Sequence, residues 1–229
     1  MDGRLLHVFD MDGTLLRDTS ASLEIAARLG RLDEIRALEA EFAAGVVDTR
    51  GFAAALYGLW RELTPAVVAE AFDGAPWIGG LAEVLADIRG RGDRAVVVTM
   101  SPDFFAGRLR GLGVHDVVAS AFPPPPFRSA PDPAGILVPE DKVTAVDRLR
   151  AALGLGRDSC VAYGDSGSDV PLFSVLRHTV AVNATPGLRA LAAAGYEGDD
   201  LRVAYALGRE LRARARVFGH GRAVRAVTR

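Results

Sequence analysis

The chain has 229 residues, of which 49% are hydrophobic and 24% charged, a balance typical of one or two globular domains rather than a disordered, collagen-like or coiled-coil protein. Its 27 basic and 29 acidic side chains give a net charge of −2, so no overall basic field favours nucleic acid or an anionic membrane. One cysteine, Cys160, excludes an internal disulfide, and no apolar run approaches the roughly 20 residues needed to span a bilayer.

Short β-branched runs alternate with helical patterns over most of the chain. The predicted strands cover residues 5–9, 94–99, 114–119, 159–163 and 179–182. The predicted helices cover residues 80–91, 102–112, 141–153, 168–176 and 186–194, with Ser101, Ser168 and Thr185 as N-caps. Strands that alternate with helices predict an α/β fold, in which helices cover both faces of a parallel sheet.

Residues 19–78 break this alternation because they contain no convincing strand. The apolar spacing there predicts four helices, over 22–29, 33–44, 49–62 and 65–72, with Thr64 capping the last. We therefore expect a sheet domain formed by residues 1–18 and 79–229, with a small helical domain at 19–78 inserted between its two parts.

Two further segments stand apart by composition. Residues 123–139 are rich in proline, which favours an ordered loop over a helix or a central strand. Residues 209–229 carry seven arginines and one glutamate, which predicts a solvent-exposed terminal helix. A contact with an acidic partner is the alternative for this tail.

The segment Asp10-Met11-Asp12-Gly13-Thr14 directly follows the first predicted strand. In parallel α/β sheets, ligands bind beyond the carboxyl ends of the strands. Two carboxylates at positions i and i+2 of an extended exit point to similar sides, so one can be a nucleophile or metal ligand and the other a general acid and base. An ordinary Asp-Gly turn is the alternative for this segment alone.

Other polar residues also stand at predicted strand or helix ends. Thr99 ends a strand and leads towards a helix N-terminus that could hold an anion, whereas Ser101 is expected to be a plain N-cap. Asp165 and Asp169 lie among glycines after another strand, and their oxygens suit a hard cation. Lys142, the only lysine among the 27 basic residues, opens a helix and offers a compact point charge.

Taken in order, these elements resemble the four motifs of the haloacid dehalogenase (HAD) superfamily of phosphohydrolases. Residues 10–14 are similar to the first motif and Thr99 to the second. Lys142 is similar to the third motif, and Asp165 with Asp169 to the fourth. The helical insert resembles the C1 cap of the family's phosphoserine phosphatase-like branch. The resemblance implies a HAD-like Rossmannoid sheet with a small α-helical cap.

The resemblance also implies roles for particular residues in a phosphomonoesterase. Asp10 would attack phosphorus and form an aspartyl-phosphate, and Asp12 would protonate the leaving alcohol and then activate water. The Thr99 hydroxyl and the Met100 N–H would hold the phosphoryl oxygens. Lys142 would offset the negative charge that builds up when a carboxylate meets a phosphate.

Mg²⁺ is the cofactor that the resemblance implies. Asp10, the carbonyl of Asp12 and Asp165 would bind it, with Asp169 supporting its waters or Lys142. A divalent cation agrees with the need to bring two anions together.

Several other reactions fit the sequence poorly. The dehalogenase branch lacks the acid found here at Asp12, and the P-type ATPase branch has a lysine where this chain has Met11. Residues 90–95 match a GxGxxA pattern, but they lie between a helix and a strand, the reverse of the nicotinamide-binding context. The only lysine is not in a GxxxxGK loop, which excludes P-loop chemistry.

The substrate is expected to be a small phosphomonoester, because a closed cap excludes larger molecules. Phosphoserine phosphatases carry a glutamate shortly after the first motif and an arginine in the cap. The matching positions here hold Thr19, beside Ser20, and Leu59, and both departures argue against phosphoserine. The candidate specificity residues are Thr19, Ser20, Arg50, Tyr57, Trp60 and Arg61. For the last four, ordinary packing or solvated charge is the alternative.

Two other functions remain as alternatives. A phosphotransferase on the same scaffold would pass the phosphoryl group to an alcohol. A catalytically silent binding module would be expected to lose Asp10, Asp12 or Lys142, and all three are present.

Acidic residues interrupt the N-terminus before a signal-peptide core could develop, so we expect a cytoplasmic protein with no membrane or nucleic-acid partner. Its oligomeric state, monomer or homodimer, is left open.

Overall fold

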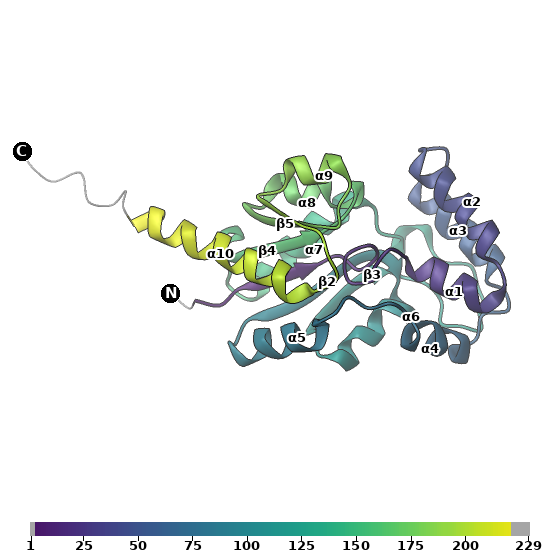
Figure 1. Ribbon diagram of the computed structural model, residues 1–229. Helices are drawn as coiled ribbons and strands as arrows, with labels where there is room; N and C mark the ends of the chain where they lie inside the picture. The colour runs from purple at the N-terminus through teal and green to yellow at the C-terminus, as the bar shows by residue number, and fades with distance from the viewer. Residues whose placement is uncertain (1–2, 221–229) are drawn as a thin grey trace, which may run out of the picture.

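A computed structural model describes residues 3–220, with side chains described up to residue 215. Six parallel strands form one sheet in the order β3-β2-β1-β4-β5-β6 (Figure 1). They are β1 (Leu6–Phe9), β2 (Arg94–Pro102), β3 (Asp116–Ser120), β4 (Cys160–Gly164), β5 (His178–Val182) and β6 (Ala194–Tyr196). The chain runs outward from β1 through β2 to β3, then crosses to β4 on the other side of β1. Ligands bind beyond the carboxyl ends of such strands, where the order reverses.

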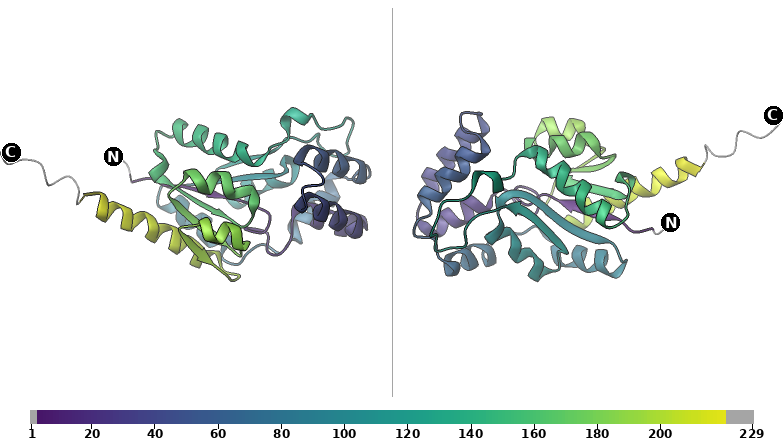
Figure 2. Two further views of the ribbon diagram at one scale, coloured as in Figure 1. Left: turned by 90° about the horizontal axis from the view of Figure 1, so that it is seen from above. Right: turned by 180° about the vertical axis from the view of Figure 1, so that it is seen from behind.

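Helices cover both faces of the sheet, which confirms the predicted fold class (Figures 1 and 2). One face packs against α5 (Leu81–Gly90), α6 (Asp103–Ala106) and α10 (Leu201–His220). The other packs against α7 (Pro139–Ala152), α8 (Val170–Val175) and α9 (Pro186–Leu191).

The side chains of β1 point alternately to the two faces of the sheet, and this determines the direction of Asp10. Leu6 and Val8 belong to the hydrophobic cluster that includes Val146 of α7, whereas Phe9 belongs to the cluster on the opposite face. Successive side chains of a strand point to opposite faces. Asp10, which follows Phe9, is therefore directed towards the α7 side of the sheet.

Four helices occupy the inserted segment between β1 and β2, at the end of the sheet where β1 finishes (Figure 1). They are α1 (Ala21–Leu29), α2 (Leu32–Ala43), α3 (Thr49–Leu59) and α4 (Pro65–Asp73). Side chains cap three of them at the N-terminus, because Ser20, Asp48 and Thr64 accept hydrogen bonds from backbone N–H groups of the first turns. The cap predicted at Thr64 is thus confirmed, with an N–H donor at Val67, 3.3 Å away.

The helical insert packs against the proline-rich loop of the core. The Trp60 ring, which is fully buried, lies 6.4 Å from that of Phe122, and the Tyr57 ring lies 5.5 Å from that of Phe127. Aromatic pairs at these separations contribute packing energy beyond simple burial. The loop around residues 123–139 is therefore held against α3 by ring contacts, and it carries one 3₁₀ turn at Pro133–Gly135.

The structure corrects several of the predicted elements. The helix expected over 49–62 ends at Leu59, and the one expected over 168–176 is a 3₁₀ turn followed by α8. The helix expected over 102–112 is instead the end of β2, followed by the short α6 and a 3₁₀ segment at Gly107–Leu112. The helix expected over 186–194 ends at Leu191 and is followed by β6. β6 was not predicted because its three residues, Ala-Gly-Tyr, carry no alternation of apolar and polar side chains.

Helix α10 starts at Leu201, well before the arginine-rich tail predicted from residue 209. Residues 221–229 of that tail lie outside the described residues. Within residues 3–220, no helix is both long enough and apolar enough to cross a membrane.

Candidate active site

Lys142 lies at the centre of the site, in the first turns of α7. Its Nζ donates hydrogen bonds to Asp10 Oδ1 at 2.8 Å, to Asp169 Oδ1 at 2.7 Å and to Ser168 Oγ at 3.1 Å. The side chain is 1% exposed, and an ammonium has three N–H donors, so every donor has a partner. Burial lowers the pKa of Lys142, but the Asp10 and Asp169 carboxylates outweigh that effect and raise it. The lysine is therefore a fixed positive charge at neutral pH.

The loop after β4 places two more carboxylates beside Asp10. Asp169 Oδ2 accepts hydrogen bonds from the backbone N–H groups of Asp165 and Ser166, at 3.1 and 3.4 Å, which closes the loop on itself. A Cβ atom at Gly164 would lie 2.3 Å from Asp169 Oδ2, so a side chain at that position would displace the carboxylate. Only glycine allows this close approach.

Gly13, in the loop after β1, likewise leaves room for the Asp165 carboxylate. Its φ angle is +76°, and a Cβ atom there would lie 2.3 Å from Asp165 Oδ2. Glycine adopts this left-handed conformation without steric cost. The first and fourth motifs can therefore approach each other closely enough to share a ligand.

The acidic residues of the site suit a divalent cation. Asp10, Asp165 and Asp169 each offer an oxygen within 4.8 Å of the others. Asp165 Oδ1 is buried and has no hydrogen-bond partner among the described residues. Burial, followed by the nearby Asp169 carboxylate, raises the pKa of Asp165 to about 7. Hard oxygen ligands and an unpaired buried oxygen fit Mg²⁺, which would relieve this crowding of negative charge.

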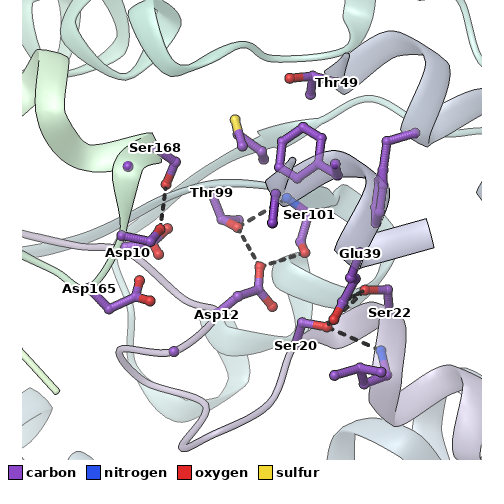
Figure 3. A pocket seen from close by; sticks show the side chains of 18 of the residues that line it. Asp10, Asp12, Ser20, Ser22, Glu39, Thr49, Thr99, Ser101, Asp165 and Ser168 are labelled. Carbon is purple, nitrogen blue, oxygen red and sulfur yellow. Dashed lines mark hydrogen bonds between the residues drawn. The ribbon is translucent and has the colours of Figure 1, made fainter. Parts of the chain in front are cut away.

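Asp12 sits where the core meets the helical insert (Figure 3). Its Oδ2 accepts from Ser101 Oγ at 2.6 Å and from Thr99 Oγ1 at 3.3 Å, while Oδ1 accepts from the Ala21 N–H at 2.7 Å. Burial raises the pKa of Asp12, and the hydrogen bonds from Ser101 and Ala21 oppose that rise. A carboxyl group whose pKa is raised is suited to exchanging protons near neutral pH.

The structure places Thr99 in the site but corrects the role expected of two serines. Thr99 is fully buried and accepts from the Ser101 N–H at 3.1 Å. Ser101 is not an N-cap, because it lies within β2 and its hydroxyl donates to Asp12 instead of accepting from a backbone N–H. Ser168 is not a cap either, because it lies within a 3₁₀ turn and accepts from Lys142.

A cavity of about 840 Å³ joins the strand ends to the helical insert. Asp10, Asp12, Thr99, Met100 and Asp165 line its core end. The insert contributes a second group of lining residues, which includes Thr19, Ser20, Ser22, Glu39, Phe42 and Phe52. The volume lies within the range of pockets that bind drug-sized ligands.

The six specificity candidates divide into two groups. Thr19 and Ser20 line the cavity, and the Thr19 hydroxyl donates to Glu24 Oε1 at 2.8 Å. The other four candidates, Arg50, Tyr57, Trp60 and Arg61, are not among the described residues that line it.

The reasons why these four stay outside the cavity are local. Trp60 is buried among aromatic rings, and Tyr57 packs on Phe127 of the proline-rich loop. Arg50 donates to the Pro133 carbonyl at 3.1 Å, and Arg61 is exposed on the surface. Glu39 and the two phenylalanines, which do line the cavity, were missed because charged and apolar residues on a helix look like ordinary surface and core positions.

Comparisons with known proteins identify the family to which the chain belongs. The family model for haloacid dehalogenase-like hydrolases matches residues 7–174. The phosphoserine phosphatase of Halobacterium salinarum is 28% identical over 188 residues, which cover 81% of this chain and 89% of that protein. A probable phosphatase of Mycobacterium tuberculosis is 30% identical over 128 residues, 56% of this chain and 41% of that protein.

Solved structures show the same fold. A substrate-bound phosphoserine phosphatase superposes with a TM-score of 0.75 at 22% identity, covering 88% of this chain and 97% of that one. The family model covers most of the chain and includes all four predicted motifs. This chain is therefore an enzyme of the haloacid dehalogenase-like hydrolase family, as the sequence resemblance predicted.

Proposed function

We propose that this protein is a Mg²⁺-dependent phosphomonoesterase that hydrolyses a small phosphorylated metabolite through an aspartyl-phosphate on Asp10. The observation that carries this proposal is the Lys142 ammonium, buried between Asp10 and Asp169 at 2.8 and 2.7 Å. A buried ion pair adds little net stability to a fold. Beside a nucleophilic carboxylate, the same cation offsets the repulsion between that carboxylate and a phosphate. The names of the matched phosphatases support this reading.

The first half of the reaction forms the intermediate. A carboxylate oxygen of Asp10 attacks phosphorus, and the bond between phosphorus and the ester oxygen breaks with its electron pair leaving on that oxygen. Asp12, in its protonated form, gives its proton to the leaving alkoxide. The Thr99 hydroxyl and the Met100 N–H, at the cavity wall, would hold the phosphoryl oxygens.

The second half releases phosphate. Asp12, now ionised, takes a proton from a water molecule whose oxygen attacks phosphorus. The bond between phosphorus and the Asp10 oxygen breaks, which regenerates the carboxylate. The hydrogen bonds from Ser101 and Ala21 hold Asp12 in one orientation through both proton transfers.

Mg²⁺ would be held by the Asp10 and Asp165 carboxylates and the Asp12 carbonyl. When bound, it polarises the phosphoryl oxygens as a Lewis acid. Asp169 supports this set through its neighbours, because it binds Lys142 and the Asp165 N–H.

The inserted helices supply the substrate-binding half of the cavity. We therefore assign residues 1–18 and 79–229 to a catalytic core and 19–78 to a cap of the C1 type. A cap that covers the strand ends favours small phosphomonoesters over phosphoproteins. A cytoplasmic location belongs to the same proposal, since a chain whose single cysteine is the buried Cys160 fits a reducing compartment.

Release of phosphate from p-nitrophenyl phosphate tests the proposal. The wild-type protein should release phosphate with Mg²⁺ and lose this activity when the metal is chelated. Asp10→Asn should lower kcat by at least about 10⁴-fold, because the variant lacks the nucleophile. Asp73→Asn, an exposed carboxylate changed in the same way, should leave the rate unaltered. Full activity in Asp10→Asn would refute the assigned nucleophile.

A further inference from the structure

Glu39 is held in a defined position at the cap end of the cavity (Figure 3). Its Oε1 accepts hydrogen bonds from Ser20 Oγ at 2.5 Å and from Ser22 Oγ at 2.7 Å. Its Oε2 accepts no hydrogen bond from the described residues. Two hydroxyl donors therefore fix the carboxylate and leave one oxygen available to a ligand.

The charge around this cavity is one-sided. Among the described residues that line it, five carry carboxylates and none is a lysine, an arginine or a histidine. Lys142, just behind the wall, already gives all three of its N–H donors to Asp10, Ser168 and Asp169. A carboxylate on the leaving group would thus be buried without a cation, which is costly. An ammonium group on the leaving group could instead pair with the Glu39 carboxylate.

The remaining walls at the cap end are apolar and aromatic. Phe42 follows Glu39 by three positions on α2, so both project from the same side of that helix. The Phe42 ring lies 5.2 Å from the ring of Phe52 on α3, with a tilt of 50°. These rings favour an apolar body, and aromatic faces also attract cations. A cavity of about 840 Å³ admits a leaving group far larger than a three-carbon one.

Two neighbouring residues connect Glu39 to the reaction centre. The Ala21 N–H binds Asp12, the proposed proton donor to the leaving oxygen, and the adjacent Ser20 hydroxyl binds Glu39. An alcohol whose oxygen reaches Asp12 therefore has Glu39 along the same wall. We propose that Glu39 binds the ammonium group of the leaving alcohol, so that the preferred substrates are phosphate esters of apolar or aromatic amino alcohols without a carboxylate. This inference rests on the proposed phosphatase function.

Three esters that differ at one position test it. They are 2-amino-3-phenylpropyl phosphate, 2-methyl-3-phenylpropyl phosphate and 2-carboxy-3-phenylpropyl phosphate, assayed for phosphate release with Mg²⁺. We expect kcat/KM for the amine to exceed that for the methyl analogue by about tenfold or more, which corresponds to about 1.4 kcal/mol. The carboxylate ester should be the poorest of the three. Values within about threefold of one another would overturn the inference.

A matched pair of variants assigns the preference to Glu39. Glu39→Gln keeps an oxygen for the two serines but removes the charge, so the ratio of amine to methyl ester should fall to about one. Glu41→Gln, an exposed position of the same helix, should keep the wild-type ratio. A preference that survives in Glu39→Gln would place the recognition of the amine elsewhere.

Binding of the free alcohols separates this inference from the proposed function. Calorimetry with 2-amino-3-phenylpropan-1-ol and 2-methyl-3-phenylpropan-1-ol needs no turnover. Selective binding of the amine by the wild type, lost in Glu39→Gln, supports the subsite even if no ester is hydrolysed, in which case the phosphatase proposal fails alone. Hydrolysis of all three esters without selective binding overturns the subsite and leaves the phosphatase proposal standing.

Discussion

The two ends of the cavity are built in different ways. At the core end, the ionisable groups bind one another: Lys142 of α7 donates to Asp10, which follows β1, and to Asp169 in the loop after β4. At the cap end, the Glu39 carboxylate lies beside aromatic rings, and its hydrogen bonds from the described residues all come from hydroxyl groups. In the proposed function, residues at the strand ends carry out the chemistry, whereas side chains on the inserted helices select the substrate. Substitutions at the two ends should accordingly have effects of different kinds.

Among substitutions at the core end, Lys142→Met should lower the free energy of unfolding the most. It leaves buried carboxylates at Asp10 and Asp169 without their cation, which typically costs about 3–5 kcal/mol of the free energy of unfolding. Activity should be lost as well. Urea denaturation at neutral pH measures the change in stability. Arg150→Met on the same helix, which breaks a partly exposed pair with Asp147, should cost less than about 1 kcal/mol. If the two variants lost equal free energy of unfolding, the buried ion pairs of Lys142 would matter no more for stability than a partly exposed pair, which would contradict the account of the core end.

Removal of divalent cations should make stability depend on pH through Asp165. Burial and Asp169 raise the pKa of this carboxyl to about 7 in the folded protein, above its ordinary value, so the folded state binds the proton more tightly than the unfolded state. The stabilisation is then complete at low pH and is lost as the pH rises through about 7.

With a chelator present, the Asp165 contribution should fall by up to about 4 kcal/mol between pH 4 and pH 8. Asp165→Asn should flatten this dependence, and exposed Asp158→Asn should not. Denaturation curves at several pH values measure it. Identical pH dependence in the wild type and Asp165→Asn would contradict the crowding of charge at the core end.

A smaller effect is expected at the junction of the two ends, from Ser101→Ala. This change removes the 2.6 Å hydrogen bond to Asp12, and bonds to charged groups contribute about 1.5–3 kcal/mol. We expect kcat to fall by about tenfold to 100-fold with little change in KM, because the bond orients the proton donor rather than the substrate. Ser174→Ala, an exposed serine, serves as the control. A rise in KM alone would indicate a role in substrate binding.

The smallest effect should come from Arg50→Ala. The arginine is exposed and does not line the cavity, and its one hydrogen bond to the described part of the chain goes to the Pro133 carbonyl. We expect kcat/KM for every ester to stay at the wild-type value. If kcat/KM fell for one ester and not for the others, Arg50 would be a specificity residue after all, and the prediction would be wrong.

Much of the core end could be predicted because several of its residues directly follow strands. Asp10 and Asp165 leave neighbouring strands of one parallel sheet, whose carboxyl ends meet at one edge. The sequence therefore indicated both the α/β fold and the grouping of these acids before any coordinates.

The rest depends on contacts that no local pattern reveals. Ser101 looks like an N-cap, but its partner Asp12 is 89 positions away in the chain. Glu39 looks like a solvated helix residue, and only the packing of α2 against α1 turns it towards Ser20 and Ser22. Trp60 and Arg50, in contrast, were candidates because of their side-chain chemistry. Trp60 instead packs on Phe122, and Arg50 binds the Pro133 carbonyl, so neither lines the cavity.

The central claim is that Asp10 becomes covalently phosphorylated. The most direct measurement is mass spectrometry of the protein after it is mixed with a phosphomonoester and Mg²⁺ and quenched rapidly in acid. We predict that one phosphoryl group is found on the peptide containing Asp10, and that it is absent in Asp10→Asn. Phosphate released at the full rate with no phosphorylated peptide, or with the phosphoryl group on another residue, would contradict the claim.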